Sequence, residues 1–467
     1  MLIDVIVDGA SSDDAAAAVL ASGGSVSRRL DVIGAVSADV PASALATLPA
    51  TGFDVTPNAP VHPTAAQFDE GEGGVNAQVL ALNPGRHGSS TGGKGVGVAL
   101  VDTGIDATHP DLDDVREGID LSGDDGSSLV DTYGHGTFIA GLIAGERTGV
   151  APGATLISIK VAGKDGSTDL GTLIQAIGWA VVNQDAAGIL VLNLSFGTLS
   201  PMAAPGDPLV QAVEAAWASG LVVVSAAGNE GPGTVTSPGT SPSALTIGAT
   251  DHMGTAHPGD DVVAEWSGSA EGRTPKPELV APGTSLISLR VKGSTVDHGN
   301  PHNLIPDGDE DAYFVGSGTS MAAGLASGAA AVVLEHHTGA RPGDVKSALV
   351  DTSAATSGSA RTINLQAAVD TDADLSDGQG TRPRADRGRA DGGAPAGFGW
   401  SGARWTGARW TEAQWEGARW TGARWTETEW GGARWTGARW TGARWTGGRW
   451  TGARWTDAEW TGARWTG

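Results

Sequence analysis

The chain has 467 residues, of which 53 are acidic and 29 basic, so its formal net charge is −24. At roughly 100–200 residues per domain, this length predicts two to three folded units. The absence of cysteine excludes disulfides, thiolate metal sites and cysteine nucleophiles. The acidic balance argues against duplex nucleic acid as a partner, because such binding needs clustered lysine and arginine. No stretch approaches the ~18 apolar residues of a transmembrane segment, so none is expected.

The first 60 residues predict a small α/β unit. Apolar alternation and turn residues indicate strands and helices in the order β-α-β-β-α-β. The expected strands are 2–7, 26–30, 32–40 and a last one from Val55, and the expected helices are 11–22 and 42–48. This order fits a split βαβ, or ferredoxin-like, motif.

From about Val96, apolar strands bounded by glycine alternate with helices. The expected strands are 96–101, 156–161, 189–194, 221–226 and 245–249, and the expected helices are 136–145, 169–185, 207–219 and 320–336. Continuous apolar strands joined by helices predict an α/β fold with a mostly parallel sheet and helices on both faces. The chemistry of such a fold is expected beyond the carboxyl ends of the strands.

Three short motifs stand at those places. Asp102 ends the first strand in Asp-Thr-Gly, His135 opens a helix in His-Gly-Thr, and Ser320 opens another in Gly-Thr-Ser-Met-Ala. A serine hydroxyl becomes a strong nucleophile when an imidazole takes its proton and a carboxylate orients that imidazole. Asn229 follows the strand 221–226. Its amide and the unpaired backbone N–H of Ser320 can both donate to a developing oxyanion.

These motifs, in the order Asp, His, Ser, resemble those of the subtilisin-like serine proteases over roughly residues 94–350. The resemblance implies that Asp102 orients the imidazole, that His135 is general base and acid, and that Ser320 is the nucleophile. It implies Asn229 as the oxyanion donor, and no cofactor required for catalysis.

The resemblance also implies a cleft that binds a peptide or protein substrate as an added strand. One side is the segment 164–167, which contains Gly166, and the other is 194–197, with Ser195, Phe196 and Gly197. Ala226, Ala227 and Gly228 would form a wall of the pocket that precedes the scissile bond. These small wall residues predict a roomy apolar pocket and broad specificity.

Placed before such a domain, residues 1–62 resemble an inhibitory propeptide, which would assist folding and then block the cleft with its end, near 61–66. The segment 63–93 is interpreted as the processing loop and the start of the mature chain, with cleavage between about 61 and 76 because exposed polar loops are where nicking concentrates. The catalytic domain would occupy 94–369. The open alternative is an accessory domain that is never removed.

Residues 370–399 are rich in Asp, Arg, Gly and Pro and predict a disordered linker. Residues 400–467 repeat Gly-Ala-Arg-Trp-Thr and contain 14 of the 17 tryptophans, one at every fifth position. One interpretation is a β-solenoid, similar to pentapeptide-repeat proteins. The interpretation that we favour is an adhesive tail that binds a cell-wall or surface polymer through Trp and Arg. Single-stranded nucleic acid is a third and weaker candidate partner.

The last two sequence features concern possible metal sites and the cellular location of the protein. Acidic clusters at 111–114, 120–125 and 307–311 could hold structural calcium, but none has the spacing of a defined calcium loop. The resemblance implies an extracellular or cell-surface protein, although the first residues lack the basic region and apolar core of a signal peptide. The alternative function is surface adhesion, with the protease domain as a scaffold.

Overall fold

The computed structural model describes residues 2–67, 92–124, 126–200, 202–271, 275–305 and 313–371, together with short strands between 393 and 466. Most of the predicted processing loop and linker therefore lie outside the described residues, as does the acidic cluster 307–311. The chain divides into two compact units. The first comprises Met1–Asn58, Pro205–Ser219 and Ser376–Gly467, and the second Ala59–Ala204 and Gly220–Leu375.

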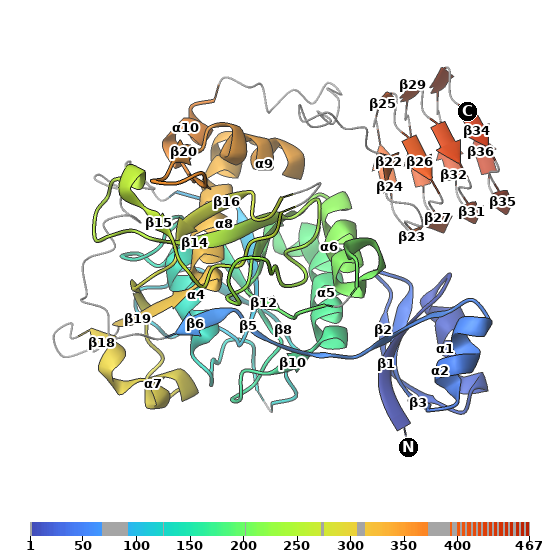
Figure 1. The fold of residues 1–467 in the computed structure, drawn as a ribbon, viewed down its shortest axis with the longest axis horizontal. Coiled ribbons are helices and arrows are strands. Elements are labelled where there is room, and N and C mark those ends of the chain that lie inside the picture. The colour runs from blue at the N-terminus through green and yellow to red at the C-terminus, as the bar shows by residue number, and fades with distance from the viewer. Residues whose placement is uncertain are drawn as a thin grey trace. The chain divides into compact units, whose positions relative to one another are not determined.

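The N-terminal part of the first unit has the predicted element order (Figure 1). Its elements are β1 (Leu2–Asp8), α1 (Ser12–Ala21), β2 (Ser25–Leu30), β3 (Ala35–Pro41), α2 (Ala44–Ala50) and β4 (Asp54–Pro57), and the sheet order is β2-β3-β1-β4. Ser11 caps α1, because its hydroxyl accepts the Asp14 N–H. Alternate residues of β1 and β3 form the core against α1. Helix α6 (Pro208–Ala218) also falls in this unit and begins after Asp207, which accepts two N–H groups of its first turn.

The second unit is built on a sheet whose central strands are parallel, which confirms the predicted fold class. The sheet order is β20-β21-β16-β14-β13-β11-β7-β9-β8, with β15 paired to β14. The strands are β7 (Gly97–Asp102), β8 (Val115–Asp120), β9 (Thr155–Lys160), β11 (Ile189–Leu194), β13 (Val222–Ala226), β14 (Leu245–Asp251), β15 (Val262–Val263), β16 (Leu279–Pro282), β20 (Ala354–Ala355) and β21 (Arg361–Thr362). The strands of this sheet that were not predicted are β8, β15, β16, β20 and β21.

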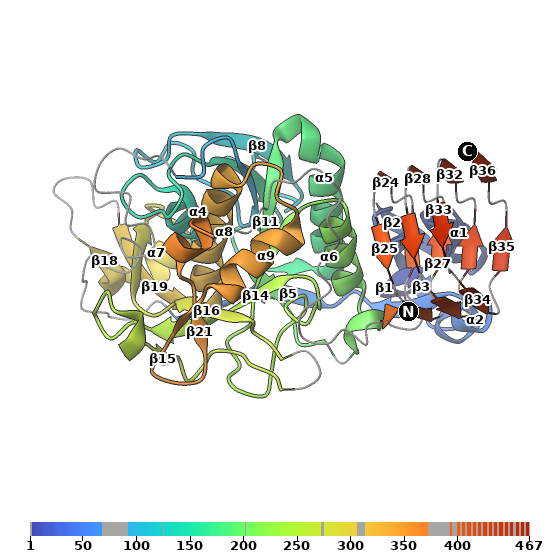
Figure 2. The ribbon, with the colours of Figure 1, turned by 90° about the horizontal axis from the view of Figure 1, so that it is seen from above.

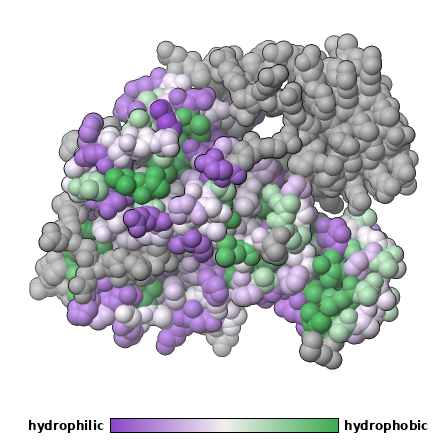
Figure 3. Space-filling model, in the orientation of Figure 1, coloured by the Kyte–Doolittle hydropathy of each residue, from purple (hydrophilic) through white to green (hydrophobic). Residues whose placement is uncertain are grey.

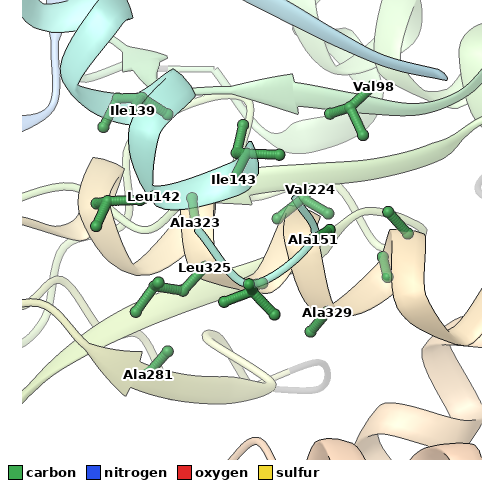
Figure 4. Close-up of a cluster of buried hydrophobic side chains, with 14 of the residues drawn as sticks. Val98, Ile139, Leu142, Ile143, Ala151, Val224, Ala281, Ala323, Leu325 and Ala329 are labelled. Atoms are coloured by element: carbon green, nitrogen blue, oxygen red, sulfur yellow. The ribbon is translucent and has the colours of Figure 1, made fainter. Parts of the chain in front are cut away.

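Helix α8 (Thr319–His336) runs through this unit beside α4 (His135–Ala144) and α9 (Pro342–Asp351) (Figures 1 and 2). It contacts β11, β13, β14 and β16, whereas α5 (Leu170–Ala187) contacts β7 and β11. The small residues of α8 permit close packing: a Cβ added to Gly324 would lie 3.1 Å from Ile139 Cγ2. Figure 4 shows Ile139, Leu142 and Ile143 of α4 on the side of α8 that carries Ala323, while Leu325 and Ala329 project from the other side, that of Ala281. The unit ends with α10 (Leu365–Val369).

Short strands complete the edge of the unit that carries the site. Strand β19 (Tyr313–Gly318) leads directly into α8 and pairs with β17 (Leu286–Leu289), β18 (Leu304–Ile305) and β6 (Ala65–Gln67). Strand β5 (Pro60–Pro63) pairs with β10 (Thr168–Asp169) and β12 (Phe196–Gly197). Helix α7 (Thr295–Gly299) follows β17.

The backbone of the repeat forms three-residue strands that pair in parallel with the fourth strand along the chain. Trp400, for example, is in register with Trp420, and Arg404 with Arg424. The first strand is the two-residue β22 (Gly393–Ala394). From β23 (Gly399–Ser401) the strands follow at five-residue spacing, through β24 (Arg404–Thr406), β25 (Arg409–Thr411) and β26 (Gln414–Glu416), to β36 (Arg464–Thr466). They form four ladders, in which the register repeats every 20 residues from β23 onward.

On the face shown in Figure 3, hydrophilic and hydrophobic residues of the described parts are interspersed. Large apolar side chains that are exposed include Val130, Val182 and Leu199. Such single exposed residues are ordinary on protein surfaces. Among the described helices, none has both the length and the apolar character to cross a membrane.

Candidate active site

The ends of β7 and the start of α4 bring a carboxylate and an imidazole together. Asp102 is the last residue of β7, and His135 is the first residue of α4. His135 Nδ1 lies 2.7 Å from Asp102 Oδ1, and both side chains are fully buried. The same carboxylate oxygen accepts the Thr103 N–H at 2.8 Å. The carboxylate therefore fixes the orientation of the ring.

The third predicted residue meets the other nitrogen of this ring. Ser320 is the second residue of α8, and its Oγ lies 3.1 Å from His135 Nε2. The ring of Phe196 stands edge-on to His135, with 6.4 Å between centroids. In the described chain, Asp102, His135 and Ser320 thus form one line of hydrogen bonds, although they are distant in sequence.

Asn229 lies just beyond the end of β13 and points its amide into the same site. Its Oδ1 accepts the N–H and the hydroxyl of Thr319, each at 3.0 Å. These two bonds fix the amide so that Nδ2 faces the cleft, where it donates to the carbonyl oxygen of Thr64. The Ser320 N–H points at the same oxygen from 3.4 Å. The Thr64 carbonyl therefore occupies the place where an oxyanion would be stabilised.

A segment of the chain itself lies in the cleft as an extended strand. Strand β5 lies between β10 and β12 and is antiparallel to both. The Thr64 N–H donates to Ser195 O at 2.9 Å. Beyond Thr64, β6 pairs with β19, the strand that leads to the nucleophile. The backbone is thus held on both sides of the Thr64–Ala65 peptide bond.

Of the predicted substrate-binding residues, Ser195, Phe196 and Gly197 contact this strand. Ser195 O accepts the Thr64 N–H, Phe196 and Gly197 pair with β5, and Ala227 and Gly228 directly precede Asn229. Gly166 lies in the turn before β10 at φ 72°, and a Cβ there would lie 2.5 Å from the Tyr133 ring. This turn leaves no room for a side chain.

A cavity of about 420 Å³ adjoins Thr64, and the predicted wall residues Ala226, Ala227 and Gly228 are not among the residues that line it. Glu230, Thr236 and Trp266 contribute to it. A Cβ on Gly228 would lie 2.6 Å from Glu230 Oε2 and 2.9 Å from Thr236 Oγ1. No described residue bonds to the buried Thr236 hydroxyl. Thr236 could not be assigned from sequence, because it comes from an irregular loop that returns to Ala227 through a backbone hydrogen bond.

One buried carboxylate near the triad also escaped the sequence analysis. Asp131 is 3% exposed and accepts hydrogen bonds from the backbone of Gly134 and Thr137 and from the hydroxyls of Thr103 and Thr137. Burial raises the pKa of the Asp131 carboxyl above its ordinary value, while these hydrogen bonds oppose that shift. No local pattern marks this residue, because it sits in a loop.

The described residues contain no group of three or more His, Cys, Asp or Glu side chains placed to hold a metal ion. In the cluster 120–125, Lys160 Nζ lies 3.4 Å from Asp124 Oδ2 and 4.0 Å from Asp120 Oδ2. An ammonium group therefore faces both of these carboxylates. In the cluster 111–114, Asp111 is buried and accepts the Arg147 N–H, and Asp114 pairs with Arg116.

Comparison with known proteins agrees with this geometry. Residues 93–400 match the model of the Subtilase family. The serine protease AprX of Bacillus subtilis (strain 168) is 39% identical over 280 residues, which cover 56% of this chain and 62% of that protein. Subtilisin Savinase of Lederbergia lenta is 36% identical over 255 residues, 54% of this chain and 80% of the relative.

Among solved structures, fervidolysin from Fervidobacterium pennivorans, described as a keratinolytic enzyme related to subtilisin, aligns with a TM-score of 0.64. At 23% identity, over 79% of this chain and 61% of that one, the likeness concerns the fold. The present chain spans less than two thirds of the length of both AprX and fervidolysin.

Proposed function

Because the chain belongs to the subtilase family, we propose that it is a serine endopeptidase that acts through an acyl-enzyme intermediate. The observation that carries this proposal is the line Asp102–His135–Ser320 ending at a peptide carbonyl, that of Thr64, which Asn229 and the Ser320 N–H hold. No cofactor takes part in this chemistry.

The geometry supports the following sequence of steps. Ser320 Oγ attacks the carbonyl carbon while His135 Nε2 takes the hydroxyl proton. Asn229 Nδ2 and the Ser320 N–H donate to the oxyanion that forms. His135 returns its proton to the leaving amine, and the C–N bond breaks. A water molecule, deprotonated by His135, then hydrolyses the ester on Ser320.

A fluorophosphonate probe and a peptide substrate test this proposal on the full chain. Wild type should be labelled and should hydrolyse the peptide, whereas Ser320→Ala should do neither. Ser327→Ala is the matched control. Ser327 is also a buried serine of α8, but its hydroxyl donates to Asn193 Oδ1 and not to His135. If wild type neither hydrolyses nor reacts, the protease domain is a scaffold, and the adhesion alternative replaces the proposal.

We further propose that the chain cleaves itself between Thr64 and Ala65 and that the released N-terminal unit inhibits the cleft. The support is the register, because β5 and β6 hold the backbone on either side of that bond and no other described peptide carbonyl lies at Asn229 Nδ2. Intact mass over time should show loss of residues 1–64 from wild type but not from Ser320→Ala. A stable full-length wild type that is nevertheless active would indicate a permanent accessory domain.

For the repeat we propose attachment to an anionic polymer at the cell surface, and hence an extracellular location. One ladder has arginine at the same position of four successive strands: Arg404, Arg424, Arg444 and Arg464. The adjacent ladders are interrupted, for example by Glu429 between Arg409 and Arg449. Co-sedimentation with isolated cell walls should retain the full chain and lose a chain that ends at residue 399. Equal sedimentation of the two would refute a role of the tail in attachment.

A further inference from the structure

The helix that begins at the catalytic histidine lacks an ordinary side-chain cap. Its N-cap is Gly134, at φ 104°, and the cap makes no side-chain hydrogen bond. The first N–H groups of any helix need partners outside the helix, and a buried helix end cannot obtain them from water. In α4, two side chains from elsewhere supply these partners: Asp131 and Thr103.

The Asp131 carboxylate accepts five hydrogen bonds. Its Oδ1 accepts the Thr103 hydroxyl at 2.8 Å, the Gly134 N–H at 2.7 Å and the Tyr133 N–H at 3.1 Å. Its Oδ2 accepts the N–H and the hydroxyl of Thr137, at 2.9 and 2.8 Å. Since every one of these partners donates, the ionised carboxylate is the form that satisfies them all. The negative charge also lies at the positive end of the α4 dipole.

These bonds join the two elements that carry the catalytic pair. Thr103 directly follows Asp102, and its hydroxyl donates to Asp131 while accepting the Gly136 N–H at 2.9 Å. Gly136 directly follows His135, and a Cβ added to it would lie 2.1 Å from Gly104 O and 3.1 Å from Asp102 Cβ. The end of β7 and the start of α4 therefore lie close together, and Asp131 bonds to Thr103, directly after β7, and to Thr137 in the first turn of α4.

We propose that Asp131 is a positioning residue for catalysis, whose carboxylate holds the start of α4 against the end of β7 and thereby places the His135 ring between Asp102 and Ser320. This inference rests on the protease function proposed above. Asp131 touches neither the substrate strand nor the reacting atoms among the contacts that the structure describes. It acts through the backbone on both sides of His135 and through Thr103.

A buried cap that only stabilises the fold is the competing explanation, and kinetics separate the two. Asp131→Asn keeps the shape of the side chain but loses the charge and one acceptor. We expect kcat to fall roughly 10–100-fold, because a catalytic group displaced by about 1 Å can cost 10²-fold. KM should stay within about twofold, since β10 and β12, which bind the substrate strand, are untouched.

The pH profile provides a readout that a structural role alone would not move. The charged and titratable groups at this site are Asp102, Asp131, His135 and the nearby Tyr133. Removing the Asp131 charge takes a negative neighbour away from the imidazolium, so the acid limb of the kcat/KM profile should shift to lower pH.

Asp111→Asn is the matched control. Asp111 is another buried carboxylate, and it accepts the Arg147 N–H beyond the opposite end of α4. This variant should lose thermal stability, while kcat and the acid limb of the pH profile stay as in wild type. A shift in the Asp111→Asn profile equal to that of Asp131→Asn would mean that any buried carboxylate has this effect, and would overturn the inference.

Thr103 gives a second test that does not depend on the folding of Asp131→Asn. Thr103→Val removes the hydroxyl that joins Asp131 to Gly136 and should lower kcat, whereas Thr103→Ser should restore it. In the double variant with Asp131→Asn, the two losses should be less than additive, because both break one network. If Asp131→Asn and Thr103→Val both kept the kcat and the pH profile of wild type, even with a lower Tm, the inference would be overturned. A wild type without hydrolysis or labelling would instead refute the proposed function.

Discussion

The carbonyl oxygen of Thr64 accepts a hydrogen bond from the side-chain amide of Asn229, 165 residues further along the chain. The same oxygen faces the Ser320 N–H. Two donors thus converge on one peptide carbonyl, next to a hydroxyl that is bonded to an imidazole. The chain's own segment takes the position of a substrate, so the contacts of residues 60–67 can be used to predict how other peptides bind.

Asn229→Ala should reduce kcat by about 10²–10³ with little change in KM, because the lost donor acts mainly on the oxyanion of the transition state. Steady-state kinetics with a short peptide measure this. Asn183→Ala is the control, since Asn183 bonds only to Trp179 O in the described structure of α5. A loss confined to KM would contradict the assigned role.

Thr236→Ala should enlarge the cavity beside Thr64. Thr236 lines the cavity beside Thr64, so its truncation should raise kcat/KM for a peptide with Phe before the scissile bond, relative to Ala, by roughly 10-fold. Thr234→Ala controls for a general effect on the loop, because Thr234 bonds to Gly231 O and is not among the lining residues. An unchanged Phe-to-Ala ratio would show that Thr236 does not limit the pocket.

Self-cleavage should depend on Val61 far more than on its neighbour. Val61 is fully buried in β5, whereas His62 is exposed. An unpaired amide in a buried position costs about 1–3 kcal/mol, so Val61→Asn should slow the loss of residues 1–64 by roughly 10-fold or more. His62→Asn should cleave at nearly the wild-type rate. Intact mass over time measures both rates. Equal cleavage rates for the two variants would argue against the register of β5 in the cleft.

Acid stability should depend on the pair Arg290–Asp297, in which Arg290 Nε lies 2.6 Å from Asp297 Oδ1. Burial alone would raise the pKa of the Asp297 carboxyl, but the hydrogen bonds from Arg290 and the Gly293 N–H outweigh it and lower the pKa below its ordinary value. A lowered pKa stabilises the fold above the unfolded pKa, near 3.9, and this contribution disappears as the pH falls through the folded pKa.

In a Ser320→Ala background, which prevents self-digestion, Asp297→Asn should therefore lower the free energy of unfolding by about 1.5–3 kcal/mol at pH 7. The difference from the parent should shrink below pH 4. Arg116→Gln, which breaks an exposed pair with Asp114, should change little at either pH. A difference that stays constant down to pH 2 would show that charge is not the cause. Thermal or urea unfolding at each pH measures the difference in the free energy of unfolding between the variant and its parent.

Several elements could be predicted because each depends on local sequence. Strands β7, β9, β11, β13 and β14 are apolar runs bounded by glycine, and their burial on both faces produces that pattern. Strand β8 was missed because Val115–Asp120 is mostly polar and pairs only with β9 at the edge of the sheet. Whether the acidic cluster 120–125 faces a cation could not be predicted from the sequence, because the ammonium group of Lys160, distant in sequence, reaches Asp120 and Asp124 only in the fold.

The sequence by itself determined the candidate triad and Asn229, because each stands in a short motif at the end of a strand or the start of a helix. Only the tertiary structure shows that the Thr64 carbonyl is the one that reaches Asn229, since the backbone pairing of β5 and β6 with β10, β12 and β19 sets its position. It also revealed the contacts of Asp131 and Thr236. Their loops have no periodic pattern, and a hydrogen bond or a cavity between distant segments leaves no local signal in the chain.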